Sequence, residues 1–264
     1  MSAELRIVGL QADLHWRNPD ANLADFDTLL TAIPAGSCDV VVLPEMFTTG
    51  FSWPPITPTD GPDSELDWMQ GWADHLGVAI AGSIACRDAE DQPRNRFWFI
   101  PPSGEGAPSF YDKRHLFTLA GEHNHFTAGE DRVELEFRGF RILLQVCYDL
   151  RFPVFVRNDR HTPYDLAIYV ANWPETRSAA WRTLLQARAI ENQCFVVGIN
   201  RSGTDGNGHR YAGDSLIADC AGALLADAGN HGQPATLQAT LNRDEMMAFR
   251  RKLPFLEDAD ARQR

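Results

Sequence analysis

The stretch VCYDLRFP, residues 146–153, decides the fold of this chain, and the rest of the sequence is organised around it. It closes the run RILLQV (141–146), whose strand-forming residues end abruptly at Cys147. This pattern predicts a buried strand that carries a thiol at its tip, on the sharp turn into a helix. Backbone N–H groups at such a turn can point at whatever the sulfur attacks. A thiol in this position still needs a base and a second oxyanion donor from elsewhere in the chain.

The chain before this turn alternates between strands and amphipathic helices. Asn18 and Pro19 are typical of the cap and first turn of a helix, and Gly77 is typical of a helix end. The strand that precedes Glu45 is apolar throughout and delivers that carboxylate at its end. The expected order is strand 5–12, helix 19–33, strand 38–44, a loop rich in Gly and Pro at 46–62, helix 63–76 and strand 78–86.

Hairpins dominate from residue 94 onward, and strands and helices alternate again later. Because the strands are too apolar to face water, we expect an α/β protein in which helices cover the sheets. No repeat or long linker divides the sequence, so we expect residues 1–264 to form a single domain. The expected elements are hairpins 96–102/108–114 and 133–137/140–146, a helix after 151–156, strand 164–172, helix 175–192, strand 194–201, a polar loop at 202–213, hairpin 214–219/222–229, strand 235–242 and helix 243–252.

Composition and charge exclude several classes of function. The formal charge is −12, from 24 Lys and Arg against 36 Asp and Glu, which argues against a nucleic-acid partner because that would require a basic face. The five cysteines are an odd number without a CxxC pair, so no disulfide framework is expected. The first residues resemble a strand and not a secretion signal, and no apolar run has the length of a membrane helix. We therefore expect a cytoplasmic protein without a membrane partner.

Three polar side chains follow apolar strands: Glu45, Lys113 and Cys147. In layered α/β folds such strand ends gather at one crevice. Their types fit acyl transfer from an amide or a nitrile. A free thiol has a pKa of about 8.5, so only a few per cent is thiolate at neutral pH. A neighbouring carboxylate is expected to take the thiol proton during attack and return it to the departing nitrogen.

The remaining steps need donors for the developing oxyanion. The ammonium of Lys113 and the backbone N–H of Tyr148 are the candidates, and one such donor is typically worth about 3–4 kcal/mol. Water then hydrolyses the thioester, with Glu45 as the base. Taken singly, each residue also has a structural alternative: an inert buried cysteine, a capping or ion-paired glutamate, and a solvated surface lysine.

Several blocks of the sequence resemble the nitrilase, or carbon–nitrogen hydrolase, superfamily. The order Glu, Lys, Cys is that of the family, and the likeness extends from residue 5 to about 242. Within it, the chain is similar to the ω-amidase branch, which hydrolyses 2-oxoglutaramate or 2-oxosuccinamate to the keto dicarboxylate and ammonia. The blocks are LPEMFTTGF (43–51), YDKRHLF (111–117), VCYDLRFP (146–153), YVANWP (169–174), ARAIENQ (187–193) and GINRSGTDGNG (198–208).

The resemblance implies a four-layer αββα sandwich that pairs through its helices into a homodimer or a higher assembly. It implies a small-molecule amide substrate and no cofactor. It also implies a second glutamate, here Glu122, which orients Lys113 and supports the surroundings of the nucleophile.

Four further residues are expected to bind substrate at the border of the crevice: Phe117, Asn172, Trp173 and Arg201. A keto-acid amide carries a carboxylate that an arginine or a backbone nest can recognise. Arg201 is the candidate for this role, and a structural ion pair is the open alternative.

Two further pairs of polar residues are not assigned to catalysis. Asp149 and Arg151 are expected to hold the nucleophile turn by ion pairing, with direct substrate contact as the alternative role. His123 and His125 lack a third ligand at a recognisable spacing, so we expect no metal site.

The triad does not discriminate between substrates within the superfamily. A nitrilase, a carbamoyl-amide hydrolase and an enzyme that repairs deaminated peptides remain alternatives. A non-catalytic binding module on the same fold is a further alternative of another class, and its sign would be a missing triad residue.

Overall fold

A computed structural model of the chain describes residues 4–56 and 64–258. The loop expected at 46–62 and the helix expected at 63–76 therefore lie partly outside the described residues. None of the described helices combines the length and the apolar character that a membrane span requires.

Two six-stranded sheets form the centre of the molecule. In each, the middle strands are parallel: β1, β2 and β3 in one, and β7, β8 and β9 in the other. The first sheet has the order β14 (Ala235–Asn242), β1 (Glu4–Gln11), β2 (Val40–Val42), β3 (Ala79–Arg87), β4 (Pro93–Ile100), β5 (Ser109–Asp112). The second has the order β13 (Leu224–Asp227), β12 (Leu216–Ala218), β9 (Phe195–Asn200), β8 (Leu166–Ala171), β7 (Phe140–Val146), β6 (Glu134–Phe137).

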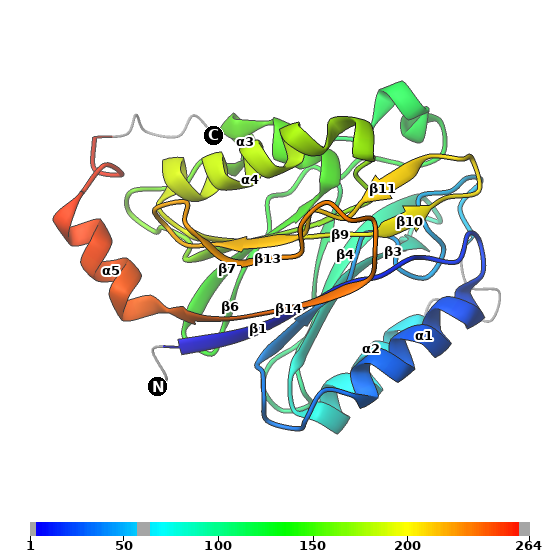
Figure 1. Cartoon of the computed structure of the whole chain (residues 1–264), viewed down its shortest axis with the longest axis horizontal. Coiled ribbons are helices and arrows are strands. Elements are labelled where there is room, and N and C mark those ends of the chain that lie inside the picture. Colours follow the sequence, from blue (N-terminus) through cyan, green and yellow to red (C-terminus); the bar gives the residue numbers. More distant parts are fainter. Residues whose placement is uncertain (1–3, 57–63, 259–264) are drawn as a thin grey trace.

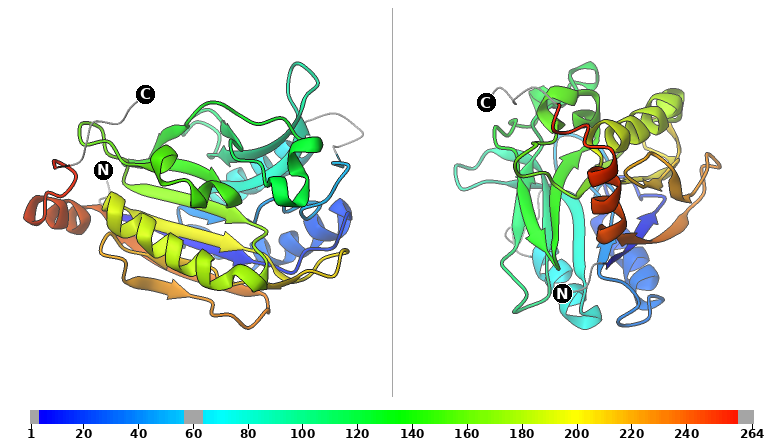
Figure 2. Two further views of the ribbon diagram at one scale, coloured as in Figure 1. Left: turned by 90° about the horizontal axis from the view of Figure 1, so that it is seen from above. Right: turned by 90° about the vertical axis from the view of Figure 1, so that its left-hand side faces the viewer.

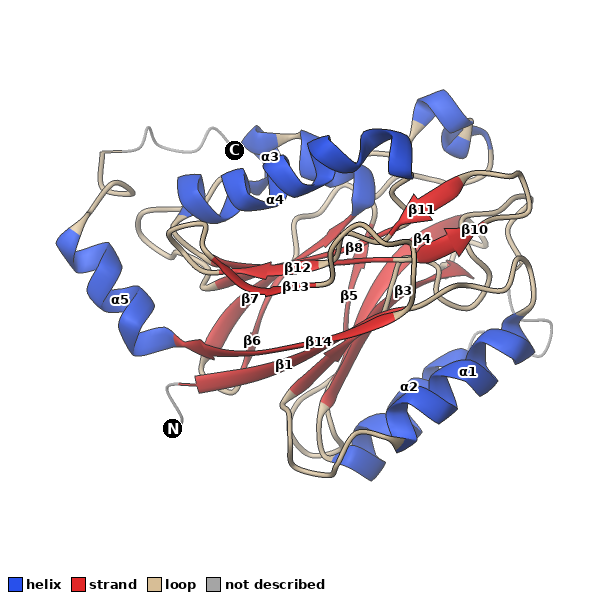
Figure 3. Cartoon of the chain, in the orientation of Figure 1, coloured by secondary structure: helices blue, strands red, loops and turns tan. Residues whose placement is uncertain are grey.

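Helices cover the outer faces of both sheets (Figures 1 and 3). Helices α1 (Pro19–Thr31) and α2 (Ser64–Leu76) lie on the first sheet, and α4 (Ser178–Asn192) lies on the second. Figure 2, in its view from above, shows α4 lying over the second sheet, roughly along its strands. The short α3 (Pro153–Val156) follows the nucleophile turn, and α5 (Arg243–Lys252) follows β14. The structure is thus the four-layer αββα sandwich that the resemblance implied.

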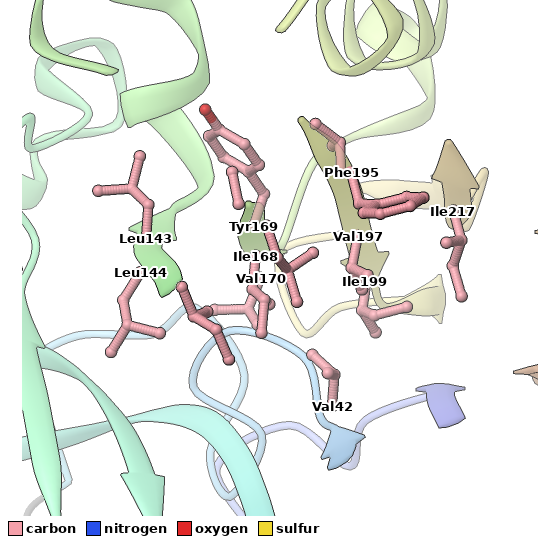
Figure 4. Packing of buried hydrophobic residues seen from close by; sticks show 14 of the residues in the cluster. Val42, Leu143, Leu144, Ile168, Tyr169, Val170, Phe195, Val197, Ile199 and Ile217 are labelled. Atoms are coloured by element: carbon pink, nitrogen blue, oxygen red, sulfur yellow. The ribbon is translucent and has the colours of Figure 1, made fainter. Parts of the chain in front are cut away.

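The sandwich forms because its central strands are apolar on both faces. In β2, Val40 and Val42 belong to the core between the two sheets, whereas Val41 belongs to the core under α1 and α2. Figure 4 shows Val42 beside the apolar side chains of β7, β8 and β9. A strand with polar residues on alternate positions could not serve both interfaces, because each face is removed from water.

Most predicted elements are confirmed, with shifts of a few residues at their ends. The Asn18 side chain accepts a hydrogen bond from the Ala21 N–H (3.2 Å) and caps α1 as expected. Gly77 follows α2 with a left-handed φ of 66°. The three predicted hairpins are the antiparallel pairs β4/β5, β6/β7 and β12/β13.

The prediction of a helix after residues 151–156 is wrong. Only α3, within that stretch, is helical, and the chain from 157 to 165 forms a loop. The buried Asn158 explains this loop. Its Oδ1 accepts the N–H groups of Asp159 and Tyr164, and its Nδ2 donates to the Tyr164 carbonyl, so the side chain closes the loop in place of helical hydrogen bonds.

The segment expected to be a polar loop at 202–213 contains a small hairpin. Its strands are β10 (Ser202–Thr204) and β11 (Arg210–Ala212). Asp205 folds the turn between them, because its Oδ1 accepts the N–H groups of Asn207 and His209 and its Oδ2 accepts the Tyr211 hydroxyl.

Candidate active site

The structure brings the three predicted strand-end residues into one buried cluster. Lys113 and Cys147 directly follow β5 and β7, and Glu45 comes shortly after β2, so both sheets contribute. Cys147 begins a 3₁₀ helix (Cys147–Arg151) and has a φ of 46°. A left-handed conformation costs a non-glycine residue on the order of 1–3 kcal/mol, and strained residues of this kind cluster at functional sites. The strand-to-helix turn predicted from the sequence is therefore present.

The Lys113 ammonium lies between two carboxylates. Its Nζ donates to Glu45 Oε1 (2.8 Å) and to the Glu122 carboxylate (3.0 Å), and all three side chains are fully buried. Burial by itself would lower the pKa of Lys113, but the charges of Glu122 and Glu45 outweigh it and raise that pKa. The lysine is therefore a permanent cation. Two of its three hydrogens hold the glutamates, which leaves the third for another acceptor.

Glu45 is held at both carboxylate oxygens. Its Oε1 also accepts a hydrogen bond from Asn95 Nδ2 (2.9 Å), and its Oε2 accepts the Asn172 N–H (2.7 Å). The Glu45 carboxylate lies close to the Cys147 thiol and interacts with it electrostatically. Burial, followed by the charge of Glu45, raises the pKa of Cys147 well above its ordinary value. The resting sulfur is therefore a protonated thiol with a base beside it, and not a preformed thiolate.

Glu122 connects the charge cluster to the neighbouring loop. Its Oε1 accepts a hydrogen bond from Asn95 (3.1 Å), and its Oε2 accepts the N–H of Phe117 (2.6 Å). Burial raises the pKa of Glu122, and the Lys113 charge opposes this shift. The position that the resemblance gave to Glu122 beside the lysine agrees with these contacts.

A cavity of about 410 Å³ opens in front of the thiol. Cys147 lines it, whereas Glu45 and Lys113 are not lining residues. The Lys113 Nζ lies 5.0 Å from the centre of the Phe51 ring, which forms part of the wall. Six aromatic residues form part of the wall: Phe51, Trp53, Phe117, Tyr148, Trp173 and Tyr211.

Three of the four predicted substrate-binding residues line this cavity: Phe117, Asn172 and Trp173. Arg201 does not, and its prediction as the carboxylate-binding residue is corrected by its contacts. The fully buried guanidinium donates to Asp13 Oδ1 (3.0 Å) and to the Leu14 carbonyl (3.1 Å), and it packs behind the Tyr211 ring. Arg201 therefore makes the structural ion pair that was its alternative.

Two arginines line the cavity: Arg151, for which substrate contact was the alternative role, and Arg177, which the sequence analysis did not consider. The Arg151 guanidinium lies over the Trp173 ring (4.8 Å), and that of Arg177 lies over the Phe117 ring (5.1 Å). In the part of the chain that the structure describes, neither guanidinium has a carboxylate partner. The signal for Arg151 was its place in the VCYDLRFP block, but no spacing rule singles out Arg177.

Asp149 holds the nucleophile turn as expected, but it does so without an ion pair to Arg151. Asp149 instead accepts hydrogen bonds from the Tyr111 hydroxyl (2.8 Å), the Val146 N–H (3.1 Å) and His115 (2.7 Å). It thus ties the nucleophile turn to the loop after β5. Arg151 is left free to face the cavity.

The position of Tyr148 suits the predicted oxyanion donor. It is the second residue of the 3₁₀ helix, where a backbone N–H has no acceptor within the helix. Its ring lines the cavity and packs edge-on against Phe117 at 5.0 Å.

Asn95 on β4 is a site residue that the sequence analysis missed. It is buried and contacts both glutamates. The available signal was an amide in an alternating strand, PRNRFWFI, on the same face as Phe97 and Phe99, where an apolar residue is expected.

One of the two histidines considered as metal ligands packs against an aromatic ring. His125 stacks on Trp53 with ring centres 5.6 Å apart. Among residues 4–56 and 64–258, no group of three or more His, Cys, Asp or Glu side chains has the arrangement to hold a metal ion.

Comparisons with known proteins agree with this geometry. The family model for carbon–nitrogen hydrolases matches residues 5–251. The chain is 47% identical to "Omega-amidase YafV" of Yersinia enterocolitica, over 97% of both chains. It is 32% identical to "2-oxoglutaramate amidase" of Bacillus subtilis (strain 168), over 94% of this chain and 95% of that protein. A crystal structure of a carbon–nitrogen hydrolase superfamily protein from Xanthomonas campestris, with an arsenic adduct in its active site, has a TM-score of 0.90 at 42% identity over 98% of both chains.

Proposed function

This chain belongs to the carbon–nitrogen hydrolase family, and we propose that it is an ω-amidase. Its reaction is hydrolysis of the terminal amide of a small keto-acid amide, such as 2-oxoglutaramate or 2-oxosuccinamate, to the keto dicarboxylate and ammonia. The observation that carries the proposal is a cavity-lining thiol beside the Glu45 carboxylate, which Lys113 holds at 2.8 Å. The full-length similarity to an ω-amidase and a 2-oxoglutaramate amidase supports the choice of substrate.

In the first half of the reaction, Cys147 is the nucleophile and Glu45 is the general base. As the sulfur attacks the amide carbon, the thiol proton moves to the carboxylate. The carbonyl oxygen becomes negative and accepts hydrogen bonds from the third hydrogen of Lys113 and from the Tyr148 N–H. The proton on Glu45 then passes to the nitrogen, which leaves as ammonia and not as an anion.

In the second half, Glu45 takes a proton from water, which attacks the thioester carbon. The sulfur leaves and recovers a proton from Glu45, which restores the thiol. Glu122 holds Lys113 through both halves, because its carboxylate keeps contact with the ammonium at 3.0 Å.

The cavity supports recognition of an anionic substrate. The guanidinium groups of Arg151 and Arg177 lie over aromatic rings of the wall. A stacked guanidinium keeps its N–H edge available for a carboxylate. We assign the carboxylate end of the substrate to these two arginines, in place of Arg201. Phe117, Asn172 and Trp173 enclose the carbon chain between the carboxylate and the thiol.

We further propose that residues 1–264 act as one domain, in the cytoplasm, as a homodimer and without a cofactor. Apolar side chains on the helices of the second sheet support the pairing: Val154 on α3 is 77% exposed and Ile190 on α4 is 53% exposed. Light scattering of the purified protein tests the assembly, and a mass near one chain would contradict it.

The decisive experiment is ammonia release from 2-oxoglutaramate by the wild type and by Cys147→Ala. Glutamine, asparagine and an aliphatic nitrile are measured alongside. Release from the keto-acid amide alone, abolished in the variant, is expected. Release mainly from the nitrile would leave the cysteine chemistry in place and refute the substrate.

The arginine assignment has its own test. Arg151→Met and Arg177→Met are expected to raise KM for 2-oxoglutaramate about tenfold or more each, because each removes a charge-assisted hydrogen bond. Arg210→Met, which replaces an exposed arginine outside the cavity lining, is the matched control. An unchanged KM in both cavity variants would refute the assignment.

A further inference from the structure

A directed chain of hydrogen bonds leads from the backbone of the Glu45 loop back to its carboxylate. The Met46 N–H donates to Ser83 Oγ (2.9 Å), and the Ser83 hydroxyl donates to Asn95 Oδ1 (2.9 Å). Asn95 Nδ2 then donates to Glu45 and to Glu122. From this geometry we propose that Asn95 is a positioning residue of the reaction, which holds Glu45 so that only its Oε2 can take the thiol proton. This inference rests on the proposed role of Glu45 as the base.

The direction of this chain is forced by its first and last members. A backbone N–H can only donate, so Ser83 Oγ accepts from Met46 and has its own hydrogen free for Asn95. The opposite orientation of the Asn95 amide would place its oxygen against two carboxylates. The amide therefore has one satisfactory orientation, and both of its hydrogens go to the glutamates.

Counting acceptors identifies the oxygen that acts as the base. A carboxylate oxygen accepts about two hydrogen bonds. Oε1 of Glu45 accepts from Lys113 (2.8 Å) and from Asn95 (2.9 Å), so both of its positions are used. Within the described residues, Oε2 has one backbone donor, the Asn172 N–H (2.7 Å). Its second position remains for the thiol.

The proton transfer follows from this arrangement. The S–H bond of Cys147 breaks as the sulfur–carbon bond forms, and the proton becomes bonded to Glu45 Oε2. When the carbon–nitrogen bond breaks, the same proton passes from Oε2 to the leaving nitrogen. Oε1 stays hydrogen-bonded to Lys113 and Asn95 throughout, so the carboxylate does not rotate.

The charge balance explains why a neutral amide is needed. Glu45 and Glu122 share a single ammonium, and all three groups are fully buried. A second cation would bind the carboxylates too tightly for one of them to accept a proton, whereas an apolar residue would leave two lone pairs unsatisfied. The amide of Asn95 supplies two donors, to oxygens 2.9 Å and 3.1 Å away, without adding charge.

The test compares Asn95→Ala and Asn95→Asp with the wild type. Removal of a hydrogen bond to a charged group is expected to lower kcat/KM on the order of 10- to 100-fold in Asn95→Ala. Asn95→Asp is expected to fall further, since it adds a third carboxyl group to the cluster. In both variants the acid limb of the pH–rate profile moves to higher pH, because ionised carboxylates lose a donor or gain a like charge.

Asn158→Ala is the matched structural control. Asn158 is also a buried asparagine whose amide donates twice, to the Tyr164 and Asn192 carbonyls at 3.0 Å and 2.9 Å. This variant is expected to lose stability while its pH–rate profile stays that of the wild type. An unshifted pH profile in the Asn95 variants, with only lower stability, would reduce Asn95 to a structural role and overturn the proposal.

Ser83→Ala keeps the inference testable if the Asn95 variants do not fold. It leaves Asn95 in place and removes the hydroxyl that orients it. A fall in kcat/KM of about 3- to 10-fold is expected, with an acid limb shifted in the same direction. A wild-type profile in Ser83→Ala would count against the directed chain.

A substrate-independent readout separates this inference from the proposed function. The rate at which iodoacetamide alkylates Cys147 is followed over pH by mass spectrometry of the cysteine peptide. If no ω-amide is hydrolysed but Asn95→Asp shifts this profile to higher pH, the substrate proposal fails and the positioning role stands. If ω-amides are hydrolysed and the profiles coincide, the positioning role fails alone.

Discussion

Glu45 and Glu65 are both buried carboxyl groups, with exposures of 0% and 5%, but their surroundings differ. Glu45 is held by Lys113, Asn95 and the Asn172 N–H. Glu65, in the first turn of α2, has the Thr48 hydroxyl beside it, and within the described residues its Oε2 has no hydrogen-bond partner. Burial raises the pKa of Glu65 to about 7.

The difference shows that burial alone does not make a base. A buried carboxyl group with few donors avoids the cost of a buried charge by keeping its proton. Glu45 combines burial with three hydrogen-bond donors, whereas burial is the main influence on the pKa of Glu65. Each prediction below changes one side of this comparison.

The largest effect is expected from Glu45→Gln. The amide cannot take the thiol proton, so kcat/KM for 2-oxoglutaramate should fall about 10²- to 10⁴-fold. Glu65→Gln is the matched variant, and its kcat/KM is expected to stay within about twofold of the wild type, because Glu65 contacts neither the cluster nor the cavity. Ammonia release measured for both variants makes the test. Equal losses would mean that the two carboxyl groups do not differ in function.

Lys113→Met removes the cation that lies beside Glu45 and has no counterpart beside Glu65 within the described residues. The Glu45 and Glu122 carboxylates would then share a buried site without compensation. Loss of one partner from a buried ion pair typically costs about 3–5 kcal/mol of unfolding free energy, and loss of an oxyanion donor typically lowers kcat about 10²- to 10³-fold.

Urea unfolding and ammonia release measure both effects. The stability loss should shrink at acid pH, where the carboxylates protonate. A loss that stays constant from acid to neutral pH would show that the lysine acts through packing instead of charge.

The sequence predicted the parts of this site that follow strand ends. Glu45 and Cys147 could be found because each comes shortly after an apolar strand within a family block, and Lys113 because it follows β5 within such a block. Asn95 could not, since its role depends on Glu45, which is 50 residues away along the chain and reaches it only through the pairing of β2, β3 and β4. The sequence also left open whether Arg201 binds the substrate or forms a structural ion pair. Its partner in that ion pair, Asp13, is 188 residues away along the chain.

Local chemistry explains the errors in the fold. Asn158 and Asp205 each fold a segment through their own side chains, one into a loop expected to be helical and one into a hairpin expected to be irregular. Hydrophobic periodicity carries no information on such side-chain-to-backbone bonds. The long apolar strands, by contrast, were predicted correctly, because burial on both faces leaves a direct mark on composition.

The smallest effect concerns the pH dependence of stability at Glu65. Its pKa is about 7 in the folded protein and 4.5 ordinarily, so between these values the folded protein holds a proton that the unfolded chain has released. Stability from this group is therefore present below pH 4.5 and is lost as the pH rises to about 7, by on the order of 3 kcal/mol. Glu65→Gln cannot ionise, so it should lack this loss.

The measurement is the free energy of unfolding of the wild type and of Glu65→Gln at pH 4 and pH 8. The stability of the variant relative to the wild type should increase by about 2–3 kcal/mol from the lower to the higher pH. This double difference cancels any packing change that the amide itself introduces. If the two proteins instead respond to pH in parallel, Glu65 ionises as an ordinary carboxyl group. It would then have a donor comparable to those of Glu45, and the contrast between the two buried acids would disappear.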